Sequence, residues 1–344
     1  MSPTHTLVGP HGRLTLRAAG GMIGPATFDV PGAGAVSPLT CPDWAERPGA
    51  EDWLPVIRNL CGDFVCVPYG APGAPNDALP ARWRQSPGPG IAGDRWFHGY
   101  AVNHDWEVVP GAEATTASMT CRPPEPHPLA EVTRRVALLP DQPGYEAELS
   151  LQARADVDFP LSLHPCFVMP GLAGSMHVDI PDAGRGWTYP LPVVHDHAPV
   201  VVDGRFDRLA AVPRGDGGSI DFTHLPPDER CEALLQLPAP AGKLQLGYPE
   251  AGYSLQFTYD AALLPTLVLW VSNRGRNEAP FDGEFRTLGV EAVAGAFDLG
   301  PAVSQSTVNP IAIDGLSTTV ALKAGERLTT TATVALEAFA AEGS

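Results

Sequence analysis

Lysine is almost missing from this chain: of its 22 basic residues, only Lys243 and Lys323 are lysines. The chain carries 39 acidic residues, its formal net charge is −17, and no run of basic residues occurs. Nucleic acids and anionic membrane surfaces select basic patches, so we expect neither as a partner. A phosphorylated ligand is disfavoured, although one local arginine cluster would be enough to bind it.

Long hydrophobic runs are also missing. The longest, residues 263–271, is too short to cross a bilayer and contains Pro265. The first residues show neither the basic stretch nor the apolar stretch of a secretory signal. We therefore expect a cytoplasmic protein that does not associate with a membrane.

Metal and cofactor signatures are missing too. None of the six cysteines forms a C-x-x-C pair, and Cys66 and Cys166 lie in apolar runs. We therefore expect six free thiols and no structural zinc. His195 and His197 share one side of an extended segment without an evident third ligand, so no metal site is expected there. No glycine-rich nucleotide loop occurs, and we expect no cofactor.

Proline and glycine, in contrast, are abundant, with 38 and 36 residues spread along the chain. That density leaves little room for long helices. Short β-branched or alternating runs recur between the turns, and they predict an all-β protein, a large antiparallel β-sandwich or barrel. The predicted strands are residues 13–17, 64–69, 106–109, 132–138, 146–152, 219–223, 244–248, 254–259, 266–271, 318–322 and 328–336.

The organisation along the chain favours a single domain over residues 1–344, because neither a repeat nor a linker is visible. Residues 68–90 and 110–128 are predicted to be long loops, and loops of that length are often functional. Residues 318–336 read as a terminal hairpin, with four threonines that favour extended structure.

His164 is the first candidate catalytic residue. Period-two alternation over residues 159–167 places it on one face with Ser162 and Cys166, opposite an apolar face. Pro165 cannot donate to a neighbouring strand, so the strand is expected at an edge or interrupted there. The alternative is a buried histidine bonded to a carbonyl.

His98 is the second candidate. The next residue in the chain, Gly99, allows a close backbone approach to a ligand. Trp96, Tyr100 and Trp106 surround it and either stack on a sugar ring or pack in the core. His104, in the same segment, reads as a turn residue.

Glu291 is the third candidate, set between Val290 and Ala292. A glutamate in such an apolar strand is costly unless it is paired or placed in a cleft. Desolvation should raise its pKa and make it a better base near neutral pH. The alternative is a strand-end carboxylate paired with Arg286.

These segments together resemble the aldose 1-epimerase (galactose mutarotase-like) family. The resemblance rests, in order, on residues 20–23 (GGMI), 65–70 (VCVPYG), 98–100 (HGY), 163–167 (LHPCF) and 289–293 (GVEAV). The HGY segment, followed by Asn103 and Trp106, is closer to the hexose-6-phosphate mutarotase branch. The resemblance implies a large antiparallel β-sandwich with a sugar site on its concave face.

Residue roles follow from the same resemblance. It implies that His164 is the catalytic acid, Glu291 the base and His98 a substrate-binding histidine. Arg82 and Arg95, with Arg58 as a third, are the candidates for the family's substrate-binding arginine, and Asp228 is the candidate for its aspartate. Trp96 is the candidate aromatic platform.

The predicted function is therefore interconversion of the α and β anomers of an aldose, by a protein that is a monomer or a homodimer. A carboxylate and an imidazole can exchange protons with the anomeric hydroxyl and the ring oxygen. Two alternatives stay open. One is a carbohydrate-binding protein of the same fold without catalysis. The other is a glycosidase or lyase, which ranks lower because a glycosidase needs two carboxylates and only one is well placed.

Overall fold

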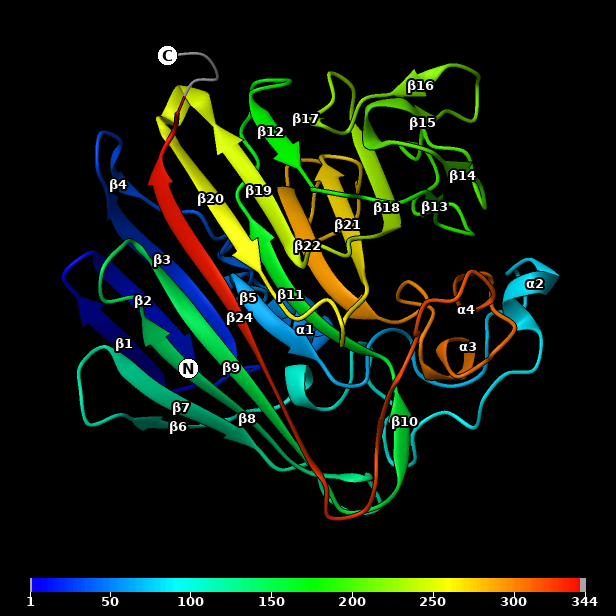
Figure 1. Ribbon diagram of the computed structural model, residues 1–344, viewed down its shortest axis with the longest axis horizontal. Helices are drawn as coiled ribbons and strands as arrows, with labels where there is room; N and C mark the ends of the chain where they lie inside the picture. The colour runs from blue at the N-terminus through cyan, green and yellow to red at the C-terminus, as the bar shows by residue number, and fades with distance from the viewer. Residues whose placement is uncertain (1, 341–344) are drawn as a thin grey trace.

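Two large antiparallel sheets make up most of the computed structural model, which describes residues 2–340. Figure 1 shows β8, β9 and β24 crossing the molecule diagonally, with β5, β11 and β22 near the centre and α2, α3 and α4 gathered at one side. The all-β sandwich prediction is confirmed. The single domain over 1–344 stays a prediction, and residues 1 and 341–344 lie outside the described residues.

The larger sheet has eleven strands in the order β1-β2-β3-β5-β11-β22-β21-β18-β13-β14, with β4 paired to β3. Its strands are β1 (Thr4–Gly9), β2 (Gly12–Arg17), β3 (Met22–Val30), β4 (Gly34–Val36), β5 (Asp63–Cys66), β11 (Leu161–Phe167), β13 (Gly186–Thr188), β14 (Arg205–Phe206), β18 (Cys231–Pro238), β21 (Thr266–Asn273) and β22 (Arg286–Ala294).

The second sheet has nine strands in the order β17-β12-β19-β20-β24-β9-β8-β7-β6. Its strands are β6 (Glu107–Pro110), β7 (Thr116–Cys121), β8 (Leu129–Leu138), β9 (Gly144–Ala153), β12 (Met176–Asp179), β17 (His224–Leu225), β19 (Lys243–Tyr248), β20 (Tyr253–Thr258) and β24 (Arg327–Ala338). Two further pairs are β10 (Val157–Phe159) with β23 (Val320–Leu322), and β15 (Val212–Pro213) with β16 (Ser219–Ile220).

Helices are short, as the proline and glycine content predicts. No helix within residues 2–340 exceeds four residues. They are α1 (Pro55–Arg58), α2 (Ala81–Arg84), α3 (Pro301–Ser304) and α4 (Pro310–Ile313), with the 3-10 turns η1 (Trp44–Glu46), η2 (Ala50–Asp52), η3 (Ala101–Asn103), η4 (Leu209–Ala211) and η5 (Pro249–Ala251). None of the described helices is long and apolar enough to cross a membrane.

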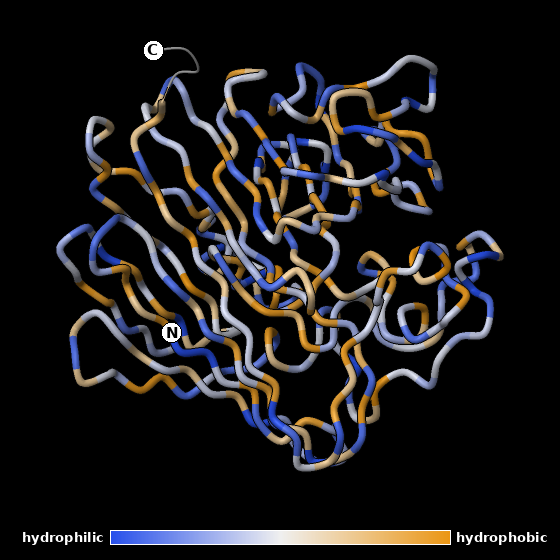
Figure 2. Tube along the Cα trace, viewed as in Figure 1, coloured by the Kyte–Doolittle hydropathy of each residue, from blue (hydrophilic) through white to orange (hydrophobic). Residues whose placement is uncertain are grey.

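The burial pattern distinguishes the two sheets. Strands of the nine-stranded sheet such as β8 and β24 alternate between buried and more exposed residues, so one face meets solvent. Figure 2 shows this alternation of hydrophilic and hydrophobic residues along the strands. In contrast, β11, β18, β21 and β22 are almost wholly buried, so both faces of the larger sheet are covered near its centre.

The two covered faces belong to different clusters of buried side chains. Leu161, Leu163 and Phe167 of β11 pack in the core between the sheets. Cys166 points the other way, into a second cluster that is closed by loop residues such as Trp44 and Trp83. The predicted alternation of β11 is therefore confirmed, and His164 lies on the face away from the nine-stranded sheet.

Two local expectations are wrong. The terminal hairpin does not form, because β23 pairs with β10 while β24 pairs with β9 and β20. Both strands therefore pair with strands that lie much earlier in the sequence. The local residue pattern does not reveal such long-range pairing. Residues 110–128 are also not one loop, because they contain β7, whose alternation was overlooked.

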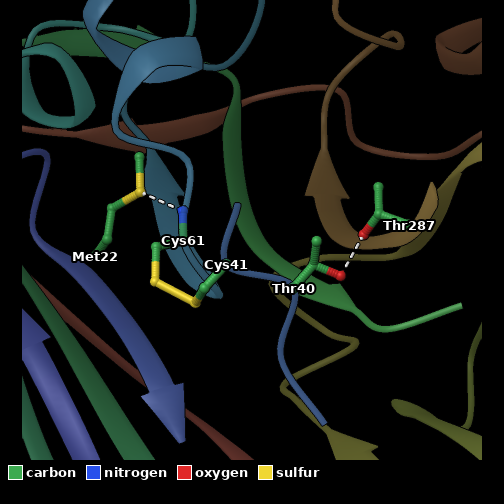
Figure 3. The surroundings of a disulfide bond; sticks show 5 residues. All are labelled: Met22, Thr40, Cys41, Cys61 and Thr287. Atoms are coloured by element: carbon green, nitrogen blue, oxygen red, sulfur yellow. Dashed lines mark hydrogen bonds between the residues drawn. A yellow bond between two sulfur atoms is a disulfide. The ribbon is translucent and has the colours of Figure 1, made fainter. Parts of the chain in front are cut away.

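The expectation of six free thiols is wrong as well, because Cys41 and Cys61 form a disulfide across 20 residues (Figure 3). Both cysteines reach the same point of β11: Thr40 N donates to Cys166 O, and Cys166 N donates to Gly62 O. The two cysteine-bearing segments come together because each pairs with β11 through its backbone, and the spacing of the cysteines in the sequence does not show this. The free and buried cysteines are Cys66, Cys121, Cys166 and Cys231.

Candidate active site

Strand pairing brings His164 and Glu291 together. β11 and β22 are antiparallel, with Leu163 opposite Ala292 and Cys166 opposite Gly289, so the same register sets His164 opposite Glu291. The ladder lapses at His164 and Pro165, the interruption that the proline predicted. The two side chains project from the same face, and His164 Nε2 lies 3.3 Å from Glu291 Oε1.

Tyr69 binds the other oxygen of the same carboxylate. Its hydroxyl donates to Glu291 Oε2 at 2.5 Å, and its ring is fully buried. Tyr69 follows β5, which ends at Cys66 rather than at the predicted residue 69, because Pro68 cannot continue the ladder. We call Tyr69, His164 and Glu291 the cavity cluster. Glu291 is therefore paired with a tyrosine and a histidine, whereas Arg286 binds Asn273.

His98 approaches this cluster from the long loop after β5. Its own φ of 63° and the φ of 88° at Gly99 are left-handed, and a Cβ on Gly99 would lie 2.2 Å from Val67 O, so only glycine fits there. Asn103 holds the loop by donating to Phe97 O and Gly99 O. The predicted close backbone approach at Gly99 is real, although it is made to the protein's own chain.

The tautomer of His98 follows from its backbone contact. Gly70 N donates to His98 Nδ1 at 3.3 Å, so the ring proton resides on Nε2. The ring stacks on Tyr69 at 5.2 Å and meets the His164 ring edge-on at 5.8 Å. His98 thus presents an N–H donor to the space beside the cavity cluster.

Burial shifts the proton affinities of the cluster. Desolvation raises the pKa of Glu291 to about 8, against the opposing hydrogen bond from Tyr69. Desolvation also lowers the pKa of His164 to about 3 and lowers the pKa of His98 well below its usual range. The predicted direction for Glu291 is confirmed. Both shifts favour the uncharged form of the group, so near neutral pH the His164–Glu291 pair carries one proton, which rests on Glu291.

His98, His164 and Glu291 line a cavity of about 260 Å³. That volume lies near the lower end of small-molecule sites, which run from roughly 300 Å³ upward. Most of the wall is apolar or aromatic, and the polar groups are few, which is typical of such sites. Its lining residues are Val56, Ile57, Leu60, Phe64, Phe97, His98, His164, Tyr189, Val193, Leu234, Trp270, Arg276, Phe281, Glu291 and Asp298.

Sequence reasoning missed three polar groups of this site: Tyr69, Arg276 and Asp298. Tyr69 stood within a quoted motif but was given no role. Arg276 lies three residues beyond the end of β21, in a loop to which no role was assigned. Asp298 follows β22, and the cavity therefore has the second carboxylate that sequence analysis did not find.

The other residues predicted to bind the substrate do not line this cavity. Arg82 pairs with Asp203, and Arg95 lies over the Trp96 ring at 5.5 Å. Trp96 lines a neighbouring pocket, while Asp228 and Arg58 line two separate surface pockets.

The aromatic neighbours of His98 are engaged with the protein itself. Trp106 is buried in the core between the sheets, and Tyr100 stacks on His104 at 3.6 Å. His104 also contacts the carbonyl of Tyr100, consistent with its expected place in a turn.

Metal-binding groups do not assemble in the described part of the chain. Within residues 2–340, histidine, cysteine, aspartate and glutamate form no group of three or more that could hold a metal ion.

Comparison with known proteins bears on the fold. No protein-family model matches the sequence, and no curated protein matches it. Solved structures do match it over nearly the whole chain, at low sequence identity. One is an aldose 1-epimerase candidate from Escherichia coli, with 16% identity, a TM-score of 0.64, and coverage of 98% of this chain and 100% of that one.

The other two give the same result. A galactose mutarotase-like protein from Clostridium acetobutylicum shares 12% identity with a TM-score of 0.60, covering 98% of this chain and 96% of its own. The GalM/aldose epimerase homologue from C. elegans shares 11% identity with a TM-score of 0.57, covering 98% and 99%. The chain has the galactose mutarotase-like fold, and at the level of the fold the resemblance read from its motifs is confirmed.

Proposed function

We propose that this protein is an aldose 1-epimerase, with Glu291 as base, His164 as acid and His98 as a donor to the sugar. The observation that carries the proposal is the 3.3 Å contact between His164 Nε2 and Glu291 Oε1 in the wall of a cavity. An acid and a base that share one proton are what the opening of a hemiacetal needs.

The chemistry balances within the pair. Moving the shared proton from Glu291 to His164 gives a carboxylate beside an imidazolium. Glu291 then takes the proton of the anomeric hydroxyl while His164 protonates the ring oxygen, and the bond between C1 and that oxygen breaks. After rotation about the C1–C2 bond the ring closes on the other face of the carbonyl, and both protons return. Opening and closing exchange the roles of the two groups.

Anomer exchange measured by saturation-transfer NMR tests this function. The panel is D-glucose, D-galactose and glucose 6-phosphate, each with the parent protein and with Glu291→Gln. Acceleration by the parent that Glu291→Gln loses supports the proposal. If the parent accelerates no sugar but still binds one, the non-catalytic sugar-binding alternative replaces it.

A glycoside hydrolase is the second candidate, because Asp298 adds a second carboxylate to the cavity. Two carboxylates flanking the bond are the requirement of that chemistry. Release of nitrophenol from nitrophenyl glycosides, abolished in both Asp298→Asn and Glu291→Gln, would favour it. The direct His164–Glu291 contact favours the epimerase instead.

A further inference from the structure

Asp298 is held in the cavity wall by its backbone. Ala71 N donates to Asp298 O at 2.8 Å, and Phe297 N donates to the side chain of Gln236 at 2.7 Å. A Cβ on Gly70, whose φ is 93°, would lie 2.6 Å from the carbonyl of Asp298, so the two segments are pressed together. The position of this carboxylate is therefore fixed before any ligand arrives.

One oxygen of this carboxylate lacks a partner. Within residues 2–340, Asp298 Oδ1 is buried and accepts no hydrogen bond. The other buried side-chain atoms without partners belong to Arg134, Trp187, Arg205 and Thr330, and none of these residues lines the cavity. A buried acceptor without a donor is costly, so its retention in a cavity wall points to a ligand that supplies the donor.

Arg276 provides the complementary donors in the same wall. Its Nε donates to the fully buried Glu232 at 2.6 Å, and Glu232 is fixed in turn by Trp270 Nε1 at 2.7 Å. The guanidinium lies 5.0 Å from the centre of the Phe281 ring. Within the described residues, its two terminal nitrogens make no hydrogen bond. Burial raises the pKa of Asp298, and the hydroxyl of Tyr189 and the positive charge of Arg276 oppose that rise.

The charges of the cavity exclude one class of ligand. Arg276 is its single cationic side chain, and Glu232 already neutralises it through their ion pair. Glu291 and Asp298 add two further carboxyl groups to the lining. A phosphate ester would meet these groups without a free cation, whereas a sugar hydroxyl can both donate to a carboxylate and accept from a guanidinium.

We propose that Asp298 and Arg276 form a hydroxyl-reading wall, which binds the hydroxyl groups of a neutral, unphosphorylated aldose away from its reacting carbon. This inference rests on the proposed function, because His164 and Glu291 take the anomeric end. The carboxylate of Asp298 accepts from one hydroxyl, and the terminal nitrogens of Arg276 donate to a neighbouring one. Nucleotide sugars and sugar phosphates are excluded by the same arrangement.

The test compares Asp298→Asn with the parent on D-glucose, its 2-, 3- and 4-deoxy analogues, and glucose 6-phosphate. Loss of one hydrogen bond to a charged group weakens binding roughly 10- to 100-fold. We expect KM for D-glucose to rise by that factor in Asp298→Asn, while kcat changes less than about threefold, since uniform binding is what is lost. One deoxy analogue should show the same loss in the parent and little further loss in the variant.

The controls separate this inference from the catalytic one. Asp282→Asn removes an exposed carboxylate outside the cavity and should leave KM unchanged. Dissociation constants measured by NMR titration in Glu291→Gln protein test the wall without catalysis. If the parent accelerates no aldose but D-glucose binding still depends on Asp298, only the proposed function fails.

Three results would overturn the proposal that Asp298 and Arg276 form a hydroxyl-reading wall. They are an unchanged KM and dissociation constant in Asp298→Asn for every sugar, tighter binding of glucose 6-phosphate than of glucose by the parent, or no binding of any sugar in the panel. The phosphate comparison uses the parent alone, so it decides the matter even if Asp298→Asn does not fold.

Discussion

Two buried clusters on opposite faces of the larger sheet are built from similar parts but differ in the type of their basic residue. In the interior cluster, Asp63 accepts from Arg134 at 2.9 Å and from the Tyr145 hydroxyl at 3.0 Å. In the cavity cluster, Glu291 meets His164 and the Tyr69 hydroxyl. Each has a carboxylate, a tyrosine and a basic group. The interior cluster has arginine where the cavity cluster has histidine.

That difference decides what each cluster can do. Arginine keeps its proton at any pH a protein meets, so the interior pair is a fixed link between β5 and β8 in the two sheets. Histidine can give up and regain a proton, and it borders a cavity. The interior cluster is therefore suited to stability and the cavity cluster to proton transfer, although both are buried carboxylate pairs.

The largest expected effect comes from breaking the cavity cluster. General acid and base groups typically contribute about 10²–10⁴-fold each, so Glu291→Gln and His164→Ala should each slow anomer exchange by at least about 10²-fold. The double variant should lose much less than the product of the two factors, because the groups share one proton. Saturation-transfer NMR measures all three rates. Exposed Glu146→Gln on β9 is the matched control, and parental rates in Glu291→Gln would refute the assignment.

Breaking the interior cluster should affect stability instead. Arg134→Met leaves the Asp63 carboxylate buried without its partner, which typically costs about 3–5 kcal/mol. Urea unfolding should show that loss, while kcat of the folded fraction stays near the parent value. The neighbouring Arg135 is exposed, so Arg135→Met is the control and should change stability little. An Arg134→Met protein with parental stability would show that the two clusters are not divided as described.

The Cys41–Cys61 disulfide lies next to the start of β5, the strand that carries Asp63 and leads to Tyr69. Closing a loop of this length stabilises a protein by about 3 kcal/mol. Reduction should therefore lower the free energy of unfolding of the parent by about that amount and leave the Cys41→Ser/Cys61→Ser variant unaffected. Thiol titration of denatured, unreduced protein should find four free cysteines, and six would contradict the disulfide.

The smallest expected effect concerns the tyrosines. The Tyr69 hydrogen bond opposes the rise in the pKa of Glu291. Tyr69→Phe should therefore raise that pKa further and move the alkaline fall of activity to higher pH, by about one pH unit. Tyr145→Phe removes the equivalent hydroxyl of the interior cluster and should leave the pH profile in place. An alkaline limb that moves to lower pH in Tyr69→Phe would reverse the assigned role.

The features of the fold and the site that were predicted correctly are those encoded in local residue patterns. The alternation of residues 159–167 placed His164 away from the core, and Pro165 marked the gap in the ladder. Glu291 stood out because a charged residue in an apolar strand needs a reason. The recurrence of short strand-like runs between turns was sufficient to predict the all-β sandwich.

The parts that it missed depend on contacts between distant segments. Arg276 and Asp298 reach the cavity from loops, and Tyr69 reaches Glu291 from the loop after β5, and no periodicity describes the course of these loops. The Cys41–Cys61 bond and the pairing of β23 with β10 arise where separate segments meet on the sheets. The proposed contacts of Arg82 and Asp228 were carried by resemblance alone, and the structure places both away from the cavity cluster.

The pH dependence of kcat/KM for anomer exchange by the parent tests the central claim most directly, since that claim is one mobile proton in the cavity cluster. Glu291 with a raised pKa of about 8 holds the proton below that pH and loses it above, when no acid remains. The account predicts a plateau through neutral pH and a tenfold fall per pH unit above about 8. A profile that rises through pH 6.5 and stays flat beyond pH 9 would match the ordinary histidine value of about 6.5 and contradict the claim.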